Sequence, residues 1–250
     1  GDLTTPAGGI AAGPAPCSII LGIPDVALPS FLLLGDSIAN GSTDNARGYI
    51  IRGLEAVNGF DAPWCRQTVN SASYWSYAQA GSAVLQDYWQ YATHIIFELG
   101  VNDVLNGRTL IQIQTDALGL WAIAKAKSSP YGEPLKVYQT TITPSTTTTD
   151  SYATLANQTP RSGFGVGGIR DQLNTWFLTK VADGTIDGVI DVAAAVADSG
   201  EPNKWKVDTT ANYATSDGTH PSPTFHSTIM PPIVNAWAAA RGIAADGSGT

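Results

Sequence analysis

Short apolar segments alternate along this chain with segments whose apolar residues recur at helical spacing, and this alternation constrains the fold most. Residues 31–34 (FLLL) form an apolar run that ends at Gly35, a pattern typical of a strand buried on both faces of a sheet. We predict strands at residues 31–34, 67–69, 93–99, 135–142 and 186–192. We predict helices at residues 47–57, 74–91, 110–126, 169–181 and 223–241. Such alternation favours right-handed crossovers, so the expected fold class is α/β, a three-layer α/β/α sandwich around a five-stranded parallel sheet.

The composition suits one large globular domain preceded by a short arm. The chain has 250 residues, of which 43% are hydrophobic, enough to bury a sizeable core. Residues 1–28 are rich in Gly, Pro and Ala and are expected to be an arm or linker, whereas residues 29–250 form the predicted domain.

The charge balance excludes some classes of partner. A net charge of −8 with 13 Lys and Arg residues argues against nucleic-acid binding, which needs a basic face. The most apolar stretch, residues 17–34, is interrupted by Pro24, Asp25 and Pro29, so no membrane span is expected. No Lys or Arg precedes Arg47, so the basic segment that opens a signal peptide is absent. We therefore expect a mature secreted protein or a domain of a longer chain.

The cysteine content leaves one structural question open. Cys17 and Cys65 are too few for a zinc site, and we expect no metal or cofactor. The two thiols could form one disulfide or remain separate and buried, as free cysteines usually are. Low charge and few cysteines favour an extracellular location.

Two motifs follow predicted strands directly, at the sheet edge where α/β proteins bind ligands. Gly35-Asp36-Ser37 places a serine at a strand-to-helix turn, next to the free N–H groups of a helix start, which suits a nucleophile. Taken alone, such a tripeptide is more often an ordinary turn. In Gly100-Val101-Asn102-Asp103, the Asn102 amide could donate to an oxyanion, whereas Asp103 is expected to cap a short helix.

A third motif, Asp217-Gly218-Thr219-His220, precedes the last predicted helix. Across three residues of a tight loop, the carboxylate can reach Nδ1 of the imidazole and leave Nε2 facing a nucleophile. The other two histidines, His94 and His226, lie in predicted elements and are expected to be structural.

Together the three motifs resemble those of the SGNH (GDSL-type) hydrolase family, over residues 29–240. The resemblance implies a flavodoxin-like sandwich and a catalytic triad of Ser37, Asp217 and His220. It also implies an oxyanion hole built from the N–H of Ser37, the side chain of Asn102 and a third backbone N–H. The family usually has a glycine at that third position, where this sequence has Ala72, a residue disfavoured at positive φ.

The expected activity is therefore serine-dependent hydrolysis of carboxylic esters through an acyl-enzyme. The family includes carbohydrate O-deacetylases, lipases, thioesterases and acyltransferases. The predicted rim loops, residues 143–150, 161–168 and 198–216, are polar, which favours removal of O-acetyl groups from a carbohydrate. Trp75 and Trp205 are candidates for stacking on a sugar, although large aromatic side chains usually pack inside.

Two alternative functions remain open. An acyltransferase would pass the acyl group to a sugar hydroxyl instead of water. A non-catalytic carbohydrate-binding or structural domain of a larger extracellular or virion protein would not use Ser37 for chemistry. The sequence leaves the oligomeric state undetermined.

Overall fold

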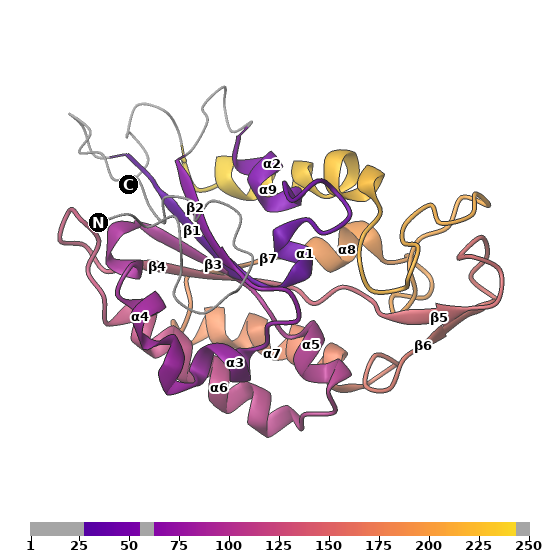
Figure 1. Cartoon of the computed structure of the whole chain (residues 1–250), viewed down its shortest axis with the longest axis horizontal. Coiled ribbons are helices and arrows are strands. Elements are labelled where there is room, and N and C mark those ends of the chain that lie inside the picture. Colours follow the sequence, from indigo (N-terminus) through magenta and orange to yellow (C-terminus); the bar gives the residue numbers. More distant parts are fainter. Residues whose placement is uncertain (1–27, 56–62, 244–250) are drawn as a thin grey trace, which may run out of the picture.

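The computed structural model describes residues 28–55 and 63–243, and confirms the predicted α/β architecture (Figure 1). Within these residues, five parallel strands form one sheet in the order β2-β1-β3-β4-β7. The strands are β1 Phe31–Gly35, β2 Trp64–Thr68, β3 His94–Glu98, β4 Lys136–Thr140 and β7 Gly188–Ile190. No helix in the described ranges is long and apolar enough to cross a membrane.

Two layers of helices cover the sheet, because β1 and β3 carry apolar side chains toward both faces. In Figure 1 one layer contains α1 Ser37–Asn40, α2 Tyr49–Leu54, α8 Val192–Val196 and α9 Pro231–Ala239. The opposite layer contains α3 Tyr74–Ala78, α4 Ala83–Gln86, α5 Val101–Leu105, α6 Leu110–Lys125 and α7 Ile169–Ala182. Helix α2 packs on α9 and α3 packs on α6, which closes the core on each side.

The strand order locates the functional edge of the sheet. The chain runs from β1 outward to β2 and then returns to the other side of β1 as β3. The carboxyl ends of β1 and β3 therefore flank a topological switch point, where open α/β sheets form their ligand crevice. Ser37 follows β1 and Asn102 follows β3, so both residues lie at this edge of the sheet.

A two-stranded antiparallel hairpin extends beyond the carboxyl edge of the sheet (Figure 1). Its strands are β5 Thr146–Thr148 and β6 Gln158–Pro160, with Thr146 opposite Pro160. The sequence did not predict this hairpin, because β5 consists only of threonines and has no alternation of apolar and polar residues.

The main differences from the predicted elements concern β2 and two helices. Strand β2 begins three residues earlier than predicted, at Trp64. The predicted helix at 74–91 is broken after α3, where Gln79 adopts an extended conformation with ψ 148°. The predicted helix at 223–241 divides into a π-helical turn, Phe225–Ile229, and α9, which has a proline in its first turn as helices tolerate.

The arm predicted at residues 1–28 lies almost entirely outside the described residues. Cys17 lies there too, while Cys65 is half-buried in β2. The disulfide between them stays a prediction.

Candidate active site

Ser37 is the first residue of α1, and only Asp36 separates it from the end of β1. Asp36 caps this helix, because its Oδ1 accepts the N–H of Ile38 at 2.7 Å. As the first helical residue, Ser37 has an N–H with no acceptor inside the helix. Gly35 permits the tight turn, since a Cβ at this position would collide with Ala39 and lie 2.9 Å from the Glu98 carbonyl oxygen. The turn thus presents both a hydroxyl and a free N–H at the crevice.

The structure joins Ser37, His220 and Asp217 in one hydrogen-bonded chain, as the sequence predicts. Ser37 Oγ lies 2.8 Å from His220 Nε2, and His220 Nδ1 lies 2.6 Å from Asp217 Oδ2. Asp217 Oδ1 also accepts the N–H groups of Thr219 and His220, each at 2.8 Å. These two bonds fix the carboxylate, so that it can hold Nδ1 protonated and leave Nε2 free to accept the serine proton.

The other histidines are not placed for this role. His94 stacks between Phe31 and Tyr138, and His226 is completely buried. Burial lowers the pKa of each to about 4. Both are therefore neutral core residues, as predicted.

Electrostatics at the triad favour a charged aspartate beside a more basic histidine. The hydrogen bond to Asp217 raises the pKa of His220 above its ordinary 6.5, against the opposing effect of burial. Burial alone would raise the pKa of Asp217, but hydrogen bonds from the His220 ring and from two backbone N–H groups hold it well below its usual range. The pair therefore keeps the geometry of base and orienting carboxylate over the neutral pH range.

These pKa shifts predict an acid limb in the rate of any reaction that uses His220 as a base. Only neutral imidazole accepts the Ser37 proton, so kcat/KM should fall about tenfold per pH unit below the raised pKa of His220. The inflection should lie above pH 6.5, because the hydrogen bond to Asp217 stabilises the charged form. A pH–rate profile measured from pH 5 to 9 checks this, and a flat profile between pH 5 and 8 would contradict the role of His220.

The loop that carries Asp217 and His220, called the catalytic loop below, is held in place by the β5–β6 hairpin and by Trp205. The Gly218 carbonyl accepts hydrogen bonds from Thr146 N and from Trp205 Nε1, both at 2.9 Å. Gly218 has φ +82°, and a Cβ there would collide with the Thr146 carbonyl oxygen and with the Tyr152 hydroxyl. The loop therefore requires glycine at this position, and its conformation depends on β5.

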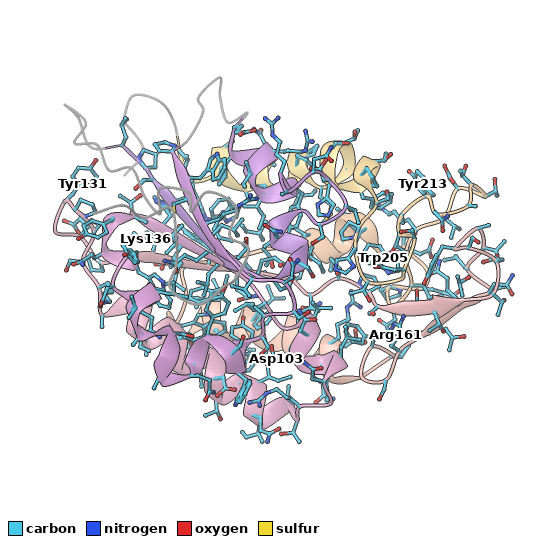
Figure 2. The ribbon with its side chains drawn as sticks, in the orientation of Figure 1. Asp103, Tyr131, Lys136, Arg161, Trp205 and Tyr213 are labelled. Carbon is cyan, nitrogen blue, oxygen red and sulfur yellow. The ribbon has the colours of Figure 1, made fainter. Side chains whose placement is uncertain are left out.

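Trp205 does not have the predicted role in substrate binding. Its side chain is completely buried, at the base of the hairpin extension in Figure 2, and so has no surface for stacking on a sugar. The sequence places Trp205 in a polar loop, but the indole instead packs inside and anchors the catalytic loop through Gly218.

Asn102 lies at the predicted place, but both of its amide hydrogens have protein acceptors. Asn102 Nδ2 is 2.9 Å from Asp36 Oδ2 and 2.9 Å from the Ala72 carbonyl oxygen. These two bonds connect the ends of β1 and β3 with the loop after β2. A role as oxyanion donor requires one of these hydrogens to turn to the substrate.

Ala72 is not available as the third oxyanion donor, which corrects the prediction. Its N–H donates to the Val69 carbonyl oxygen at 2.9 Å, within a turn where Ser71 has φ 64°. The residue contributes through its carbonyl group instead, as the acceptor for Asn102. The sequence could indicate the loop but not which of its N–H groups is used internally.

Asp103 has a structural role, but in a different helix from the one expected. Its buried carboxylate accepts the N–H groups of Tyr74 at 2.9 Å and Trp75 at 3.4 Å, and so caps α3 instead of its own helix α5. Trp75 is half-exposed, with the Arg108 guanidinium 6.0 Å from the centre of its ring. Of the two tryptophans predicted to bind substrate, Trp75 alone has exposed surface.

Comparison with known proteins supports the fold. Neither a family model nor a curated protein matches the sequence. Among solved structures, a GDSL-like lipase from Bacteroides thetaiotaomicron VPI-5482 is similar at TM-score 0.56 and 14% identity, with 86% of this chain and 92% of that chain covered. A member of the lipolytic protein G-D-S-L family from Veillonella parvula DSM 2008 has TM-score 0.55 and 16% identity, with 84% and 96% covered.

A third similar structure is the esterase EstA from Pseudoalteromonas sp., inhibited by monoethylphosphonate. Its TM-score is 0.54 and its identity 14%, with 84% of this chain and 94% of that chain covered. At such low identity the likeness concerns the arrangement of the backbone. The chain has the fold of the SGNH, or GDSL-type, hydrolases.

Proposed function

We propose that this protein is a serine ester hydrolase that works through an acyl-enzyme and removes O-acetyl groups from a carbohydrate. The observation that carries the proposal is the hydrogen-bonded chain from Ser37 Oγ through His220 to Asp217, with distances of 2.8 and 2.6 Å. A domain that only binds carbohydrate has no need for a serine hydroxyl aligned on an imidazole, so this geometry favours catalysis.

The triad would carry the reaction in two halves. His220 Nε2 accepts the Ser37 proton as Ser37 Oγ bonds to the ester carbonyl carbon, and the carbonyl oxygen becomes an oxyanion. When the carbon–oxygen bond to the alcohol breaks, His220 returns its proton to the departing alcohol. Water then adds to the acyl-enzyme with His220 again as base, which releases the acid and restores the Ser37 hydroxyl. Asp217 stays ionised throughout and orients the ring.

Two donors are proposed for the oxyanion. The Ser37 N–H has no partner within α1 and points from the helix start, where the helix dipole also favours negative charge. Asn102 would supply the second hydrogen bond by turning one N–H from Ala72 O or Asp36 Oδ2 toward the oxyanion. Such donors are worth roughly 10²–10³ in rate each.

The surroundings of the triad support a polar alcohol component. The β5–β6 hairpin adjoins the catalytic loop; β5 consists of three threonines, and β6 consists of Gln158, Thr159 and Pro160. Trp75, half-exposed and beside Arg108, offers an aromatic face of the kind that stacks on sugar rings. An O-acetylated glycan fits these features better than a long acyl chain does. The extracellular location expected from the composition agrees with such a substrate and is likewise a proposal.

A covalent label tests the proposal directly. The wild-type protein should hydrolyse p-nitrophenyl acetate, and diethyl p-nitrophenyl phosphate should stop the reaction by transferring one diethylphosphoryl group to Ser37 Oγ. Mass spectrometry of the digested protein should place the adduct on the peptide that contains Ser37. Hydrolysis that continues after complete labelling, or an adduct on another residue, would contradict the proposal.

Substrate and acyl acceptor are tested by product analysis. With O-acetylated xylan fragments, the hydrolase should release free acetate at a rate that does not depend on an added sugar acceptor. Acetate transferred to the added sugar would instead show an acyltransferase. A clear preference for long-chain p-nitrophenyl esters over acetate would exclude the deacetylase.

A further inference from the structure

Two carboxyl groups lie buried together directly behind the nucleophile, and the triad mechanism uses neither. Asp36 ends the turn after β1, and Glu98 ends β3, in register with Gly35 of the neighbouring strand. Their exposed fractions are 0% for Asp36 and 5% for Glu98. The two side chains hydrogen-bond with one another. Such a contact needs a hydrogen on one of the two carboxyl groups, since two carboxylates only accept.

Both carboxyl groups also accept hydrogen bonds from backbone or amide N–H groups of the site. Asp36 accepts the Ile38 N–H at 2.7 Å through Oδ1 and the Asn102 amide at 2.9 Å through Oδ2. Glu98 accepts the Ala39 N–H at 3.0 Å through Oε2. The pair thus connects the start of α1, which carries Ser37, with the side chain of Asn102. Because donors reach both oxygens of Asp36, that residue is best suited to carry the negative charge.

In the described part of the chain, no lysine or arginine forms an ion pair with Asp36 or Glu98. Other titratable groups interact electrostatically with the pair. They lie on α2, α3, α5 and the catalytic loop, and are Tyr49, Tyr74, Tyr77, Asp103 and His220. Two neighbouring carboxylates without a lysine or arginine partner cannot both ionise in a dry interior at neutral pH.

We propose that Glu98 is a protonated positioning residue that donates its hydrogen to the Asp36 carboxylate and thereby holds Asn102 and the start of α1 in the geometry for ester hydrolysis. This inference rests on the proposed function. Asp36 and Glu98 do not touch the substrate; they act through the Asn102 amide and the N-terminal turn of α1.

The charge environment supports this assignment. Burial raises the pKa of Asp36 to about 7, although the Ile38 N–H, Glu98 and His220 all favour its ionised form. Burial, together with the charge of Asp36 and the hydrogen bond between the two side chains, raises the pKa of Glu98 well above its ordinary range. Because N–H donors reach both oxygens of Asp36, we assign the negative charge to Asp36 and the proton to Glu98. The three tyrosines have pKa values raised by burial and stay neutral over the same range.

Loss of the Glu98 proton should then lower the rate at alkaline pH. A second negative charge would repel the Asp36 carboxylate and weaken its bonds to Asn102 and Ile38. The acid limb of the pH profile reports His220, on whose pKa the charge of Asp36 also acts, whereas the alkaline limb reports Glu98. The wild-type kcat should therefore pass through a maximum and decline above neutrality.

Three glutamate substitutions distinguish the effect of the Glu98 proton from the effect of side-chain packing. Glu98→Gln keeps the shape and a permanent donor, so kcat at pH 7 should stay within about threefold of the wild type and the alkaline decline should disappear. Glu98→Ala removes the donor, and kcat should fall about tenfold or more with little change in KM, because small displacements of catalytic groups are costly. Glu133→Gln makes the same chemical change at an exposed site and should leave the whole profile unchanged. At each pH, the rate measured with Ser37→Ala is subtracted as the background.

Two measurements do not depend on activity. The infrared difference spectrum between the wild type and Glu98→Gln at pH 7 should contain the C=O stretch of a protonated carboxyl group. Because both carboxyl groups have raised folded-state pKa values, wild-type stability should decrease as pH rises from about 4, where unfolded carboxyls ionise, through those folded values. Urea unfolding at pH 5 and pH 9 should show a smaller decrease for Glu98→Gln.

The outcomes distinguish this inference from the proposed function. An alkaline decline that persists in Glu98→Gln, or a loss in Glu98→Gln as large as in Glu98→Ala, would overturn the positioning role. An absent carboxyl band would overturn the protonated state of Glu98. If the wild type has no Ser37-dependent hydrolysis, the proposed function fails and the positioning role with it, while the infrared band still decides where the proton resides.

Discussion

Replacement of Ser37 by alanine should lower kcat for ester hydrolysis by about 10⁶-fold, to the rate left by binding alone. Ser37 supplies the only protein atom that the proposed mechanism bonds to the acyl carbon, and His220 Nε2 lies 2.8 Å from its Oγ. Without that oxygen, the imidazole has no nucleophile to activate. Steady-state hydrolysis of p-nitrophenyl acetate, with substrate concentration varied, measures the change.

A matched control is available in the turn that follows α1. Ser42 is exposed and lies five residues after the nucleophile, so Ser42→Ala should retain the wild-type rate. The fold of Ser37→Ala should remain intact, because the Ser37 hydroxyl contacts His220 and not the core, and its thermal unfolding should match the wild type. A Ser37→Ala protein that keeps more than a tenth of the activity would show that another residue is the nucleophile.

Replacement of Asp217 by asparagine should lower kcat by about 10⁴-fold, as expected when the orienting carboxylate of a triad is lost. Asparagine can still accept the two backbone N–H groups that Oδ1 accepts at 2.8 Å. Its NH2 group would then face His220 Nδ1 and favour the tautomer with the hydrogen on Nε2. In that tautomer Nε2 cannot accept the proton of Ser37.

The same substitution makes a second, independent change. Because the hydrogen bond to Asp217 is the main cause of the raised pKa of His220, the acid limb of the pH profile should move to lower pH in Asp217→Asn. Asp208→Asn, an exposed aspartate in the neighbouring loop, serves as the control and should alter neither rate nor profile. A loss below about tenfold would remove Asp217 from the triad.

The main features of the fold could be predicted because they depend on local apolar patterns. The run at β1 is apolar on both faces, and helix α6 was predicted at residues 110–126 and lies at Leu110–Lys125. The bounds of strand β2 were harder to predict, since this strand lies at the sheet edge and carries Arg66 and Gln67, which weaken the apolar signal. The hairpin β5–β6 gave no apolar signal, because it is held by backbone pairing and by contacts with the catalytic loop.

The triad could be predicted for a different reason. Ser37 follows a strand, and Asp217 and His220 belong to one short loop, so sequence spacing brings the latter two together. The remaining parts of the site depend on long-range packing. Nothing local in the sequence shows that Ala72 uses its N–H within a turn, that Trp205 is buried, or that Asp36 meets Glu98. The last contact follows from the register between β1 and β3, in which Gly35 lies opposite Glu98.

The attachment of the catalytic loop to β5 has an evolutionary consequence. The conformation around Gly218 is maintained by Thr146 of β5 and by Trp205, which packs at the base of the β5–β6 hairpin. Mutations that reshape this hairpin should therefore also shift His220, the proposed general base. The proposed mechanism then implies that specificity and turnover are epistatically linked, so directed evolution of the hairpin should keep Thr146, Trp205 and Gly218 fixed and vary the tip between β5 and β6.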